Sequence, residues 1–136
     1  MKKILFLLCT LMLLPLISAC GKGGNTDHVQ RNIGSSQIYT EEEILEIMGI
    51  VENFFEKEFV GCTLTELTYD EERSNLSCDE WADTYQAKQA IIFYSTFQVD
   101  ASGGDGSLNP NSTYTNWNWI LTKDNSNKWT LKTWGY

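Results

Sequence analysis

The sequence predicts an α+β fold in which a long N-terminal helix packs on an antiparallel β-sheet, preceded by a lipoprotein signal peptide. Three observations lead to this prediction. Apolar residues recur at helical spacing between residues 44 and 59, and from residue 90 onward the pattern changes to strict alternation. The first 19 residues have the charge and hydropathy of a secretory signal. Because one face of the sheet is apolar, it needs a cover, which the amphipathic helix supplies.

The leader ends at Cys20. Two lysines follow the first methionine, residues 4–14 are almost wholly apolar, and small residues precede the cysteine. The apolar run is shorter than the roughly 20 residues that a spanning helix needs. The tetrapeptide Ile-Ser-Ala-Cys that ends at Cys20 resembles a bacterial lipobox, which implies cleavage before Cys20 and a palmitate-type diacyl anchor on its sulfur. The alternative is a plain secretory signal with an incidental cysteine.

The predicted organisation has three parts. Residues 1–19 are the cleaved signal peptide, residues 20–38 are the lipidated cysteine and a flexible tether, and residues 39–136 are a single α+β domain. The tether prediction comes from a composition rich in Gly, Ser, Asn and Thr without an apolar period. Such a coil spans roughly 23 Å, so the domain is expected just above the head groups, at the outer face of the cytoplasmic membrane.

The charge of the chain limits its partners. The chain has 10 Lys and Arg against 18 Asp and Glu, a formal net charge of −8, and removal of the signal peptide with its two lysines makes this −10. An acidic domain binds nucleic acid poorly, because phosphates are neutralised by Lys and Arg. Anionic lipid repels it too, so the Cys20 lipid is the expected membrane contact. A protein partner or small ligand is expected to be neutral or basic.

The first helix begins with a predicted capping box, in which Thr40 and Glu43 satisfy each other's backbone N–H groups. Gly61 ends the helical segment, and Glu56 and Lys57 are expected on its solvent side. The residues predicted to face the core share helical spacing: Ile44, Ile47, Met48, Val51, Phe54, Phe55 and Phe59.

A strand over residues 63–70 and a charged turn over residues 70–73 follow. A second, short helix is predicted to start with Ser77 and Glu80 as another capping box and to end near Ala87. Leu76 and Trp81 are its predicted hydrophobic staple.

Three alternating strands complete the chain as an antiparallel meander. The turn before the last strand is Asp124 to Asn127, and within that strand Trp129, Leu131 and Thr133 share one face. One face of the two preceding strands is formed by Ile91, Phe93, Ser95, Phe97, Val99, Trp117, Trp119 and Leu121.

Two cysteines remain in the domain, Cys62 and Cys78. They either pair as a disulfide or stay unpaired, with Cys62 buried as a small hydrophobic residue and Cys78 at a helix start. Two unpaired thiols are the favoured interpretation, because two cysteines do not make a disulfide framework.

The domain contains no histidine, so the usual Ser-His and Cys-His devices and an ordinary zinc site are excluded. Residues 100–114 form the most distinctive loop, and we interpret its glycines as meeting backbone demands. Its spacing is not that of a calcium loop, and no metal or cofactor is predicted. The candidate ligand-contacting residues of this loop and of the strand after it are Asp100, Asp105, Asn109, Asn111, Trp117 and Trp119. The two tryptophans form either a stacking platform or part of the core, and the core interpretation is preferred.

Several short motifs resemble those of a family of small Gram-positive lipoproteins of unknown function. They are Gly61-Cys62-Thr63-Leu64-Thr65, the segments 69–72 and 103–114, and the closing Lys132-Thr133-Trp134-Gly135-Tyr136. The order of elements is similar to the nuclear transport factor two-like, or cystatin-like, superfamily. That resemblance implies a long helix in the palm of a curved antiparallel sheet. It transfers no catalytic residue, because no catalytic motif of the superfamily matches.

The expected function is therefore a non-catalytic binding or accessory module of the cell envelope. One alternative is an isomerase, dehydratase or hydrolase with a pocket between helix and sheet, where Asp83, Tyr85 or Tyr94 would act as acid or base. The other is an inhibitor or immunity-type protein that blocks a secreted enzyme with its acidic face. A deep pocket containing a carboxyl of raised pKa would favour the enzyme.

Overall fold

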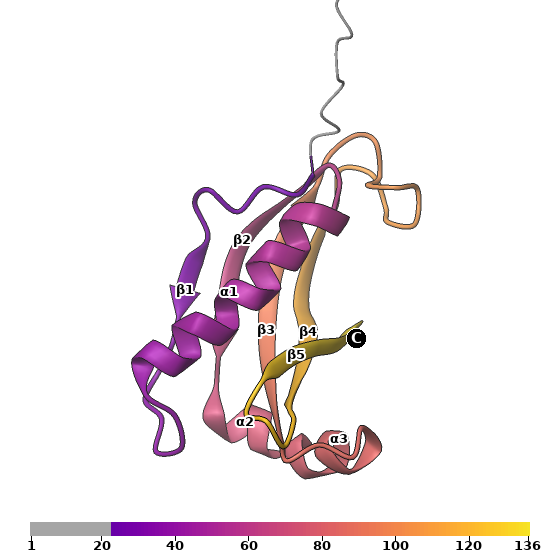
Figure 1. Cartoon of the computed structure of the whole chain (residues 1–136). Helices are drawn as coiled ribbons and strands as arrows, with labels where there is room; N and C mark the ends of the chain where they lie inside the picture. The colour runs from indigo at the N-terminus through magenta and orange to yellow at the C-terminus, as the bar shows by residue number, and fades with distance from the viewer. Residues whose placement is uncertain (1–22) are drawn as a thin grey trace, which may run out of the picture.

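The computed structural model describes residues 23–136 and places them in an α+β fold with a mixed five-stranded sheet. The strands are β1 (Gln30–Asn32), β2 (Cys62–Tyr69), β3 (Gln89–Val99), β4 (Thr113–Lys123) and β5 (Trp129–Gly135), and they lie in sequence order across the sheet. Figure 1 shows helix α1 (Glu41–Glu58) across one face of this sheet. Helices α2 (Glu71–Asn75) and α3 (Cys78–Thr84) lie at one end. The predicted signal peptide and the predicted lipidation site Cys20 lie outside the described residues.

Helix α1 begins at the predicted cap. The Thr40 hydroxyl accepts from the Glu43 N–H at 3.2 Å, and the Glu43 carboxylate accepts from the Thr40 N–H at 2.9 Å. The predicted apolar stripe faces the sheet, with Phe54 half-buried and the other six residues buried. Glu56 and Lys57 are exposed as expected. The local signals of α1 therefore agree with its packing.

The core lies between α1 and one face of the sheet. The residues predicted for that face on β3 are buried, including Ser95, which is 3% exposed. Ser95 is tolerated there because its hydroxyl accepts from the Trp119 indole N–H at 2.8 Å. Trp119 is fully buried, which supports the core interpretation of this tryptophan.

The region between β2 and β3 differs from its prediction. The charged turn is the start of α2, because the Asp70 carboxylate caps the helix by accepting from the Arg73 N–H at 3.1 Å. The predicted box at α3 is wrong: Ser77 makes no side-chain cap, and Leu76 is 83% exposed, so it does not act as a staple. The hydroxyl of Ser74 instead joins α2 to the sheet, since it accepts from the Ile92 N–H at 3.0 Å. Tertiary contact thus overrides the local capping signal.

The flexible tether is the largest correction. Residues 23–32, which we call the N-terminal strap, pack along β2 and α1. Strand β1 pairs with β2 in parallel, so the sheet is mixed rather than antiparallel. Asn25 continues this pairing, donating to Cys62 O at 2.8 Å and accepting from Leu64 N at 2.9 Å. Short polar segments of this kind form a strand when a sheet edge satisfies their backbone groups.

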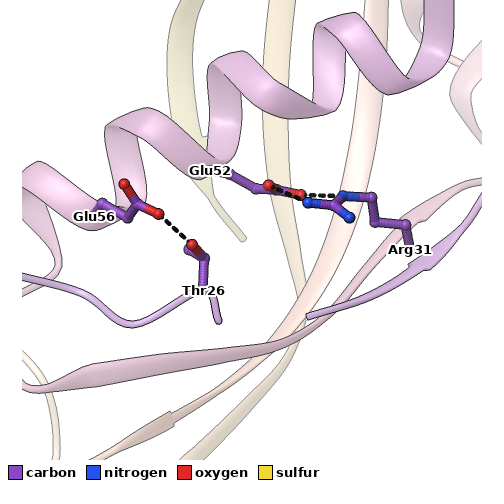
Figure 2. A network of polar contacts seen from close by, with 4 residues as sticks. All are labelled: Thr26, Arg31, Glu52 and Glu56. Atoms are coloured by element: carbon purple, nitrogen blue, oxygen red, sulfur yellow. Dashed lines mark hydrogen bonds and ion pairs between the residues drawn. The ribbon is translucent and has the colours of Figure 1, made fainter. Parts of the chain in front are cut away.

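The glycines of the strap serve close packing instead of flexibility. Gly24 donates its N–H to Glu56 O at 3.0 Å. A Cβ at Gly24 would lie 2.4 Å from Phe55 O, so only glycine allows this approach. Figure 2 shows two side-chain contacts that join the strap to α1: Arg31 binds both carboxylate oxygens of Glu52 at 2.6 and 2.7 Å, and Thr26 donates to Glu56.

A third carboxylate, that of Glu71, organises the turn that leads into α1. Glu71 accepts from the Ser36 hydroxyl and from the backbone N–H of Gln37, the latter at 3.1 Å. These hydrogen bonds favour the ionised form and lower the pKa of Glu71 below its ordinary 4.5. Because the folded pKa is depressed, the stabilisation is present above about pH 4.5 and is lost as the pH falls through the folded value.

We therefore expect Glu71→Gln to lower stability at pH 7 and to have much less effect at pH 3. Urea midpoints of wild type and Glu71→Gln at both pH values measure this. The contributions of all other carboxyls to the pH dependence cancel, because both proteins contain them. Glu72→Gln removes the same charge from the neighbouring exposed side chain and should change stability by less than about 0.5 kcal/mol. A difference between wild type and Glu71→Gln that does not shrink with acid would contradict the role of the carboxylate.

Candidate functional site

A pocket of about 220 Å³ opens where α1 ends, beside the loop of residues 100–112 that joins β3 to β4. We call it the loop-end pocket. Its walls come from the end of α1, the start of β2, the loop, and one tryptophan each of β4 and β5. Figure 1 shows this loop and the end of α1 at the same end of the molecule as residue 23. The side chains that define its chemistry are Glu58, Phe59, Cys62, Asp105, Trp117 and Trp134.

The loop is folded by its own polar side chains. Asp100 accepts from the Ser102 N–H at 2.8 Å, and Asp105 accepts from the Ser107 N–H at 3.0 Å. Gly103 and Gly104 have φ of 73° and 67°, so the predicted backbone role of the glycines is confirmed. The hydrogen bonds from the two serines lower the pKa of both aspartates, which keeps these carboxyls ionised.

The predicted contact residues separate into two groups. Asp105 and Trp117 line the loop-end pocket. Asp100, Asn109 and Asn111 do not line this pocket and instead take part in the loop's own hydrogen bonds: Asp100 O accepts from the Asn111 N–H at 2.9 Å, and the Asn109 N–H donates to the Tyr114 hydroxyl at 3.1 Å. Within residues 23–136, no group of three or more His, Cys, Asp or Glu is arranged to hold a metal ion.

The aromatic wall continues into the core. Phe59 meets Trp117 edge to face at 6.3 Å between ring centroids, and it lies 5.3 Å from Trp119 beneath. The ring of Trp134 packs against that of Phe54 of α1, with 4.5 Å between the ring centroids, and Trp134 remains 42% exposed. The indole N–H of Trp117 is buried and has no hydrogen-bond acceptor among residues 23–136. An unpaired buried donor costs about 1–3 kcal/mol, so this one is unusual.

Sequence reasoning missed Glu58 and Trp134. Glu58 sits at the end of α1, where nothing in the sequence distinguishes it from the neighbouring charged residues. Trp134 was missed because alternation fails in β5: Leu131 pairs with Leu121, but Thr133 pairs with Ile120. This β-bulge places Trp134 opposite Trp119 and on the core side of the sheet. A bulge of this kind leaves no clear mark in a period-two pattern.

The two cysteines are free thiols. Cys62 is 2% exposed, and burial, together with the negative charges of Asp100 and Asp105, raises its pKa to about 11. Cys78 lies 2.9 Å from Ser74 O, and burial raises its pKa as well. Both thiols stay protonated at neutral pH, so neither has the character of a reactive thiolate.

The acid–base candidates lie elsewhere. Asp83 and Tyr85 belong to the exposed part of α3 and its end, and Tyr94 packs under the Arg73 guanidinium at 3.6 Å from its ring centroid. In the described part of the chain, every carboxyl whose pKa departs from its ordinary value has a lowered pKa. The arrangement therefore offers charge and aromatic surface for binding, and it favours no general acid.

Comparison with known proteins found no family model, curated protein or solved structure that matches this chain. Among residues 23–136, no helix is long and apolar enough to cross a membrane.

Proposed function

We propose that this protein is a lipid-anchored, non-catalytic binding module of the cell envelope that presents the loop-end pocket close to the membrane. The lipobox at Cys20 supplies the anchor, and the outer face of the cytoplasmic membrane is the location. The net negative charge supports a neutral or basic ligand or protein partner and argues against nucleic acid.

The docking of the N-terminal strap is the observation that carries this proposal. Gly24 is hydrogen bonded to Glu56, two residues before the pocket residue Glu58. Three peptide units separate Cys20 from Gly23, the first residue of the strap, so a lipid on Cys20 would hold the strap close to the bilayer. The pocket is thus held near the bilayer by a packed segment, where a free coil of residues 20–38 would let it move over a longer distance.

The chemistry of the pocket supports binding over catalysis. Phe59, Trp117 and Trp134 offer apolar and aromatic surface, which gives most ligand sites their affinity, and Glu58 and Asp105 add charge. A carboxyl that acts as a general acid at neutral pH needs a raised pKa, whereas that of Asp105 is lowered.

For the fold we propose the nuclear transport factor two-like, or cystatin-like, architecture. Helix α1 across one face of strands β2 to β5 supports this assignment, because a helix held by a sheet is the basis of that cone. The parallel β1 is an addition at the sheet edge.

The anchor is tested by Cys20→Ala. We expect wild-type protein in the native envelope to incorporate a fatty-acid analogue and to sediment with membranes, and the variant to lose the label and remain uncleaved. The reason is that the acyl chains attach to the Cys20 sulfur, and two chains give stable anchoring. Metabolic labelling followed by membrane fractionation measures both results.

Cys62→Ala is the matched control, because it removes a thiol from the folded domain and should leave the label intact. Equal labelling of wild type and Cys20→Ala would overturn the proposed location.

A further inference from the structure

We propose that the loop-end pocket binds a small organic cation of the ammonium type. This inference rests on the proposed binding function and names the chemical class of its ligand. Two features of the pocket support it: its charge, and two tryptophans that have no basic side chain of the described residues over their rings.

The charge of the pocket is negative and unbalanced. Glu58 comes from the end of α1 and Asp105 from the facing loop, and none of the residues lining the pocket is basic. Asp105 stays ionised because Ser107 hydrogen bonds to it. Burial, and after it the negative charges of Asp100 and Asp105, raise the pKa of Cys62 on the same wall. Carboxylates on two sides of an aromatic pocket favour a cation over a neutral or anionic ligand.

The aromatic faces are not used by the protein's own cations. In the described part of the chain, basic side chains lie over three rings: Arg73 over Tyr94, Lys123 over Trp129 and Lys132 over Tyr85. Neither Trp117 nor Trp134 has such a partner, although both line the pocket. Tryptophan is the aromatic residue that binds cations best, and ammonium groups are bound between such rings and carboxylates.

The experiment uses choline, a quaternary ammonium ion, and its neutral isostere 3,3-dimethylbutan-1-ol, which has the same shape without the charge. The whole chain is titrated in neutral maltoside micelles while the indole N–H NMR signals are followed. We expect saturable shifts of the Trp117 and Trp134 signals with choline, with a dissociation constant on the order of 1 mM, as for other very small ligands. The isostere should bind at least about fivefold more weakly, since it lacks the charge.

Charge-neutral variants locate the binding. Glu58→Gln and Asp105→Asn should each weaken choline binding by about twofold to fivefold, the range for exposed ion pairs. An asparagine can still accept from the Ser107 N–H, so the loop is kept. Glu46→Gln removes one charge from an exposed position near the start of α1, away from the pocket, and should leave choline binding unchanged. Binding should also weaken as salt is raised.

Two further arms identify the source of the cation. In nanodiscs of phosphatidylcholine, a lipid head-group ligand would shift both indole signals before choline is added, whereas in phosphatidylglycerol nanodiscs free choline would still be needed. Full response to free choline in both kinds of nanodisc would indicate a soluble cation.

Equal binding of the isostere, or the absence of saturable shifts at Trp117 and Trp134, would overturn the proposal. This outcome is independent of the Cys20 labelling experiment, because the titration in micelles does not require acylation.

Discussion

Replacing Phe55 by alanine is expected to lower the free energy of unfolding by about 3–5 kcal/mol, which is the usual cost of removing a large buried ring. Phe55 is fully buried, stacks on Phe59 at 4.7 Å between centroids, and meets Phe97 and Trp119 edge to face. Since a domain of this size has about 5–15 kcal/mol in total, the variant should be close to unfolding under native conditions. Urea unfolding followed by circular dichroism measures the change.

Lys57→Ala is the matched control, because Lys57 is an exposed residue of the same helix and should cost less than about 0.5 kcal/mol. Glu56 is less suitable, since its carboxylate accepts from Thr26. Phe54→Ala should cost less than Phe55→Ala, because Phe54 is only half-buried beside Trp134. Similar urea midpoints for Phe55→Ala and Lys57→Ala would mean that α1 does not fill this face of the sheet.

A chain that begins at Gln37 is expected to be about 2–4 kcal/mol less stable than one that begins at Gly23. It loses the partly buried side chains of Val29 and Ile33 and the hydrogen bonds that join the strap to β2. It also leaves β2 as an unprotected sheet edge, which favours aggregation. Thermal and urea unfolding of the two chains, with sedimentation to detect aggregates, measures both effects.

Arg31→Ala in the chain that begins at Gly23 separates the contribution of strand pairing from that of the ion pair. It removes the contact with Glu52, whose effect at the surface should be under about 1 kcal/mol and should fall with added salt. If the two chain lengths unfold at the same urea concentration, the strap is not part of the cooperative unit.

The strap shows why a compositional argument failed here. Glycine, serine and asparagine usually indicate a flexible linker, and residues 23–32 lack an apolar period. Their order depends on a sheet edge contributed by β2, more than thirty residues later, and on the small size of Gly24 against Phe55. Contacts at such sequence separation cannot be read from the local pattern.

The candidate site was predictable only in part. Asp105 and Trp117 were chosen from the composition of the loop and the strand that follows it, and the structure places both in one pocket. Glu58 and Trp134 were not chosen. The first comes from another element, and the second depends on a β-bulge that changes the face of its strand. A pocket formed by separate elements is a property of their packing.

By itself the sequence determined the capped helix α1 with its apolar stripe and the alternating strands β3 and β4, whereas the leader stays a prediction. Their signals are local, because a cap, a helical period and a period of two each operate within a few residues. Only the tertiary structure decided the parallel β1, the attachment of α2 to the sheet through Ser74, the unused cap at Ser77 and the aromatic, acidic pocket. Each of these depends on which distant group satisfies a backbone amide or covers a ring, and that is fixed when the chain packs.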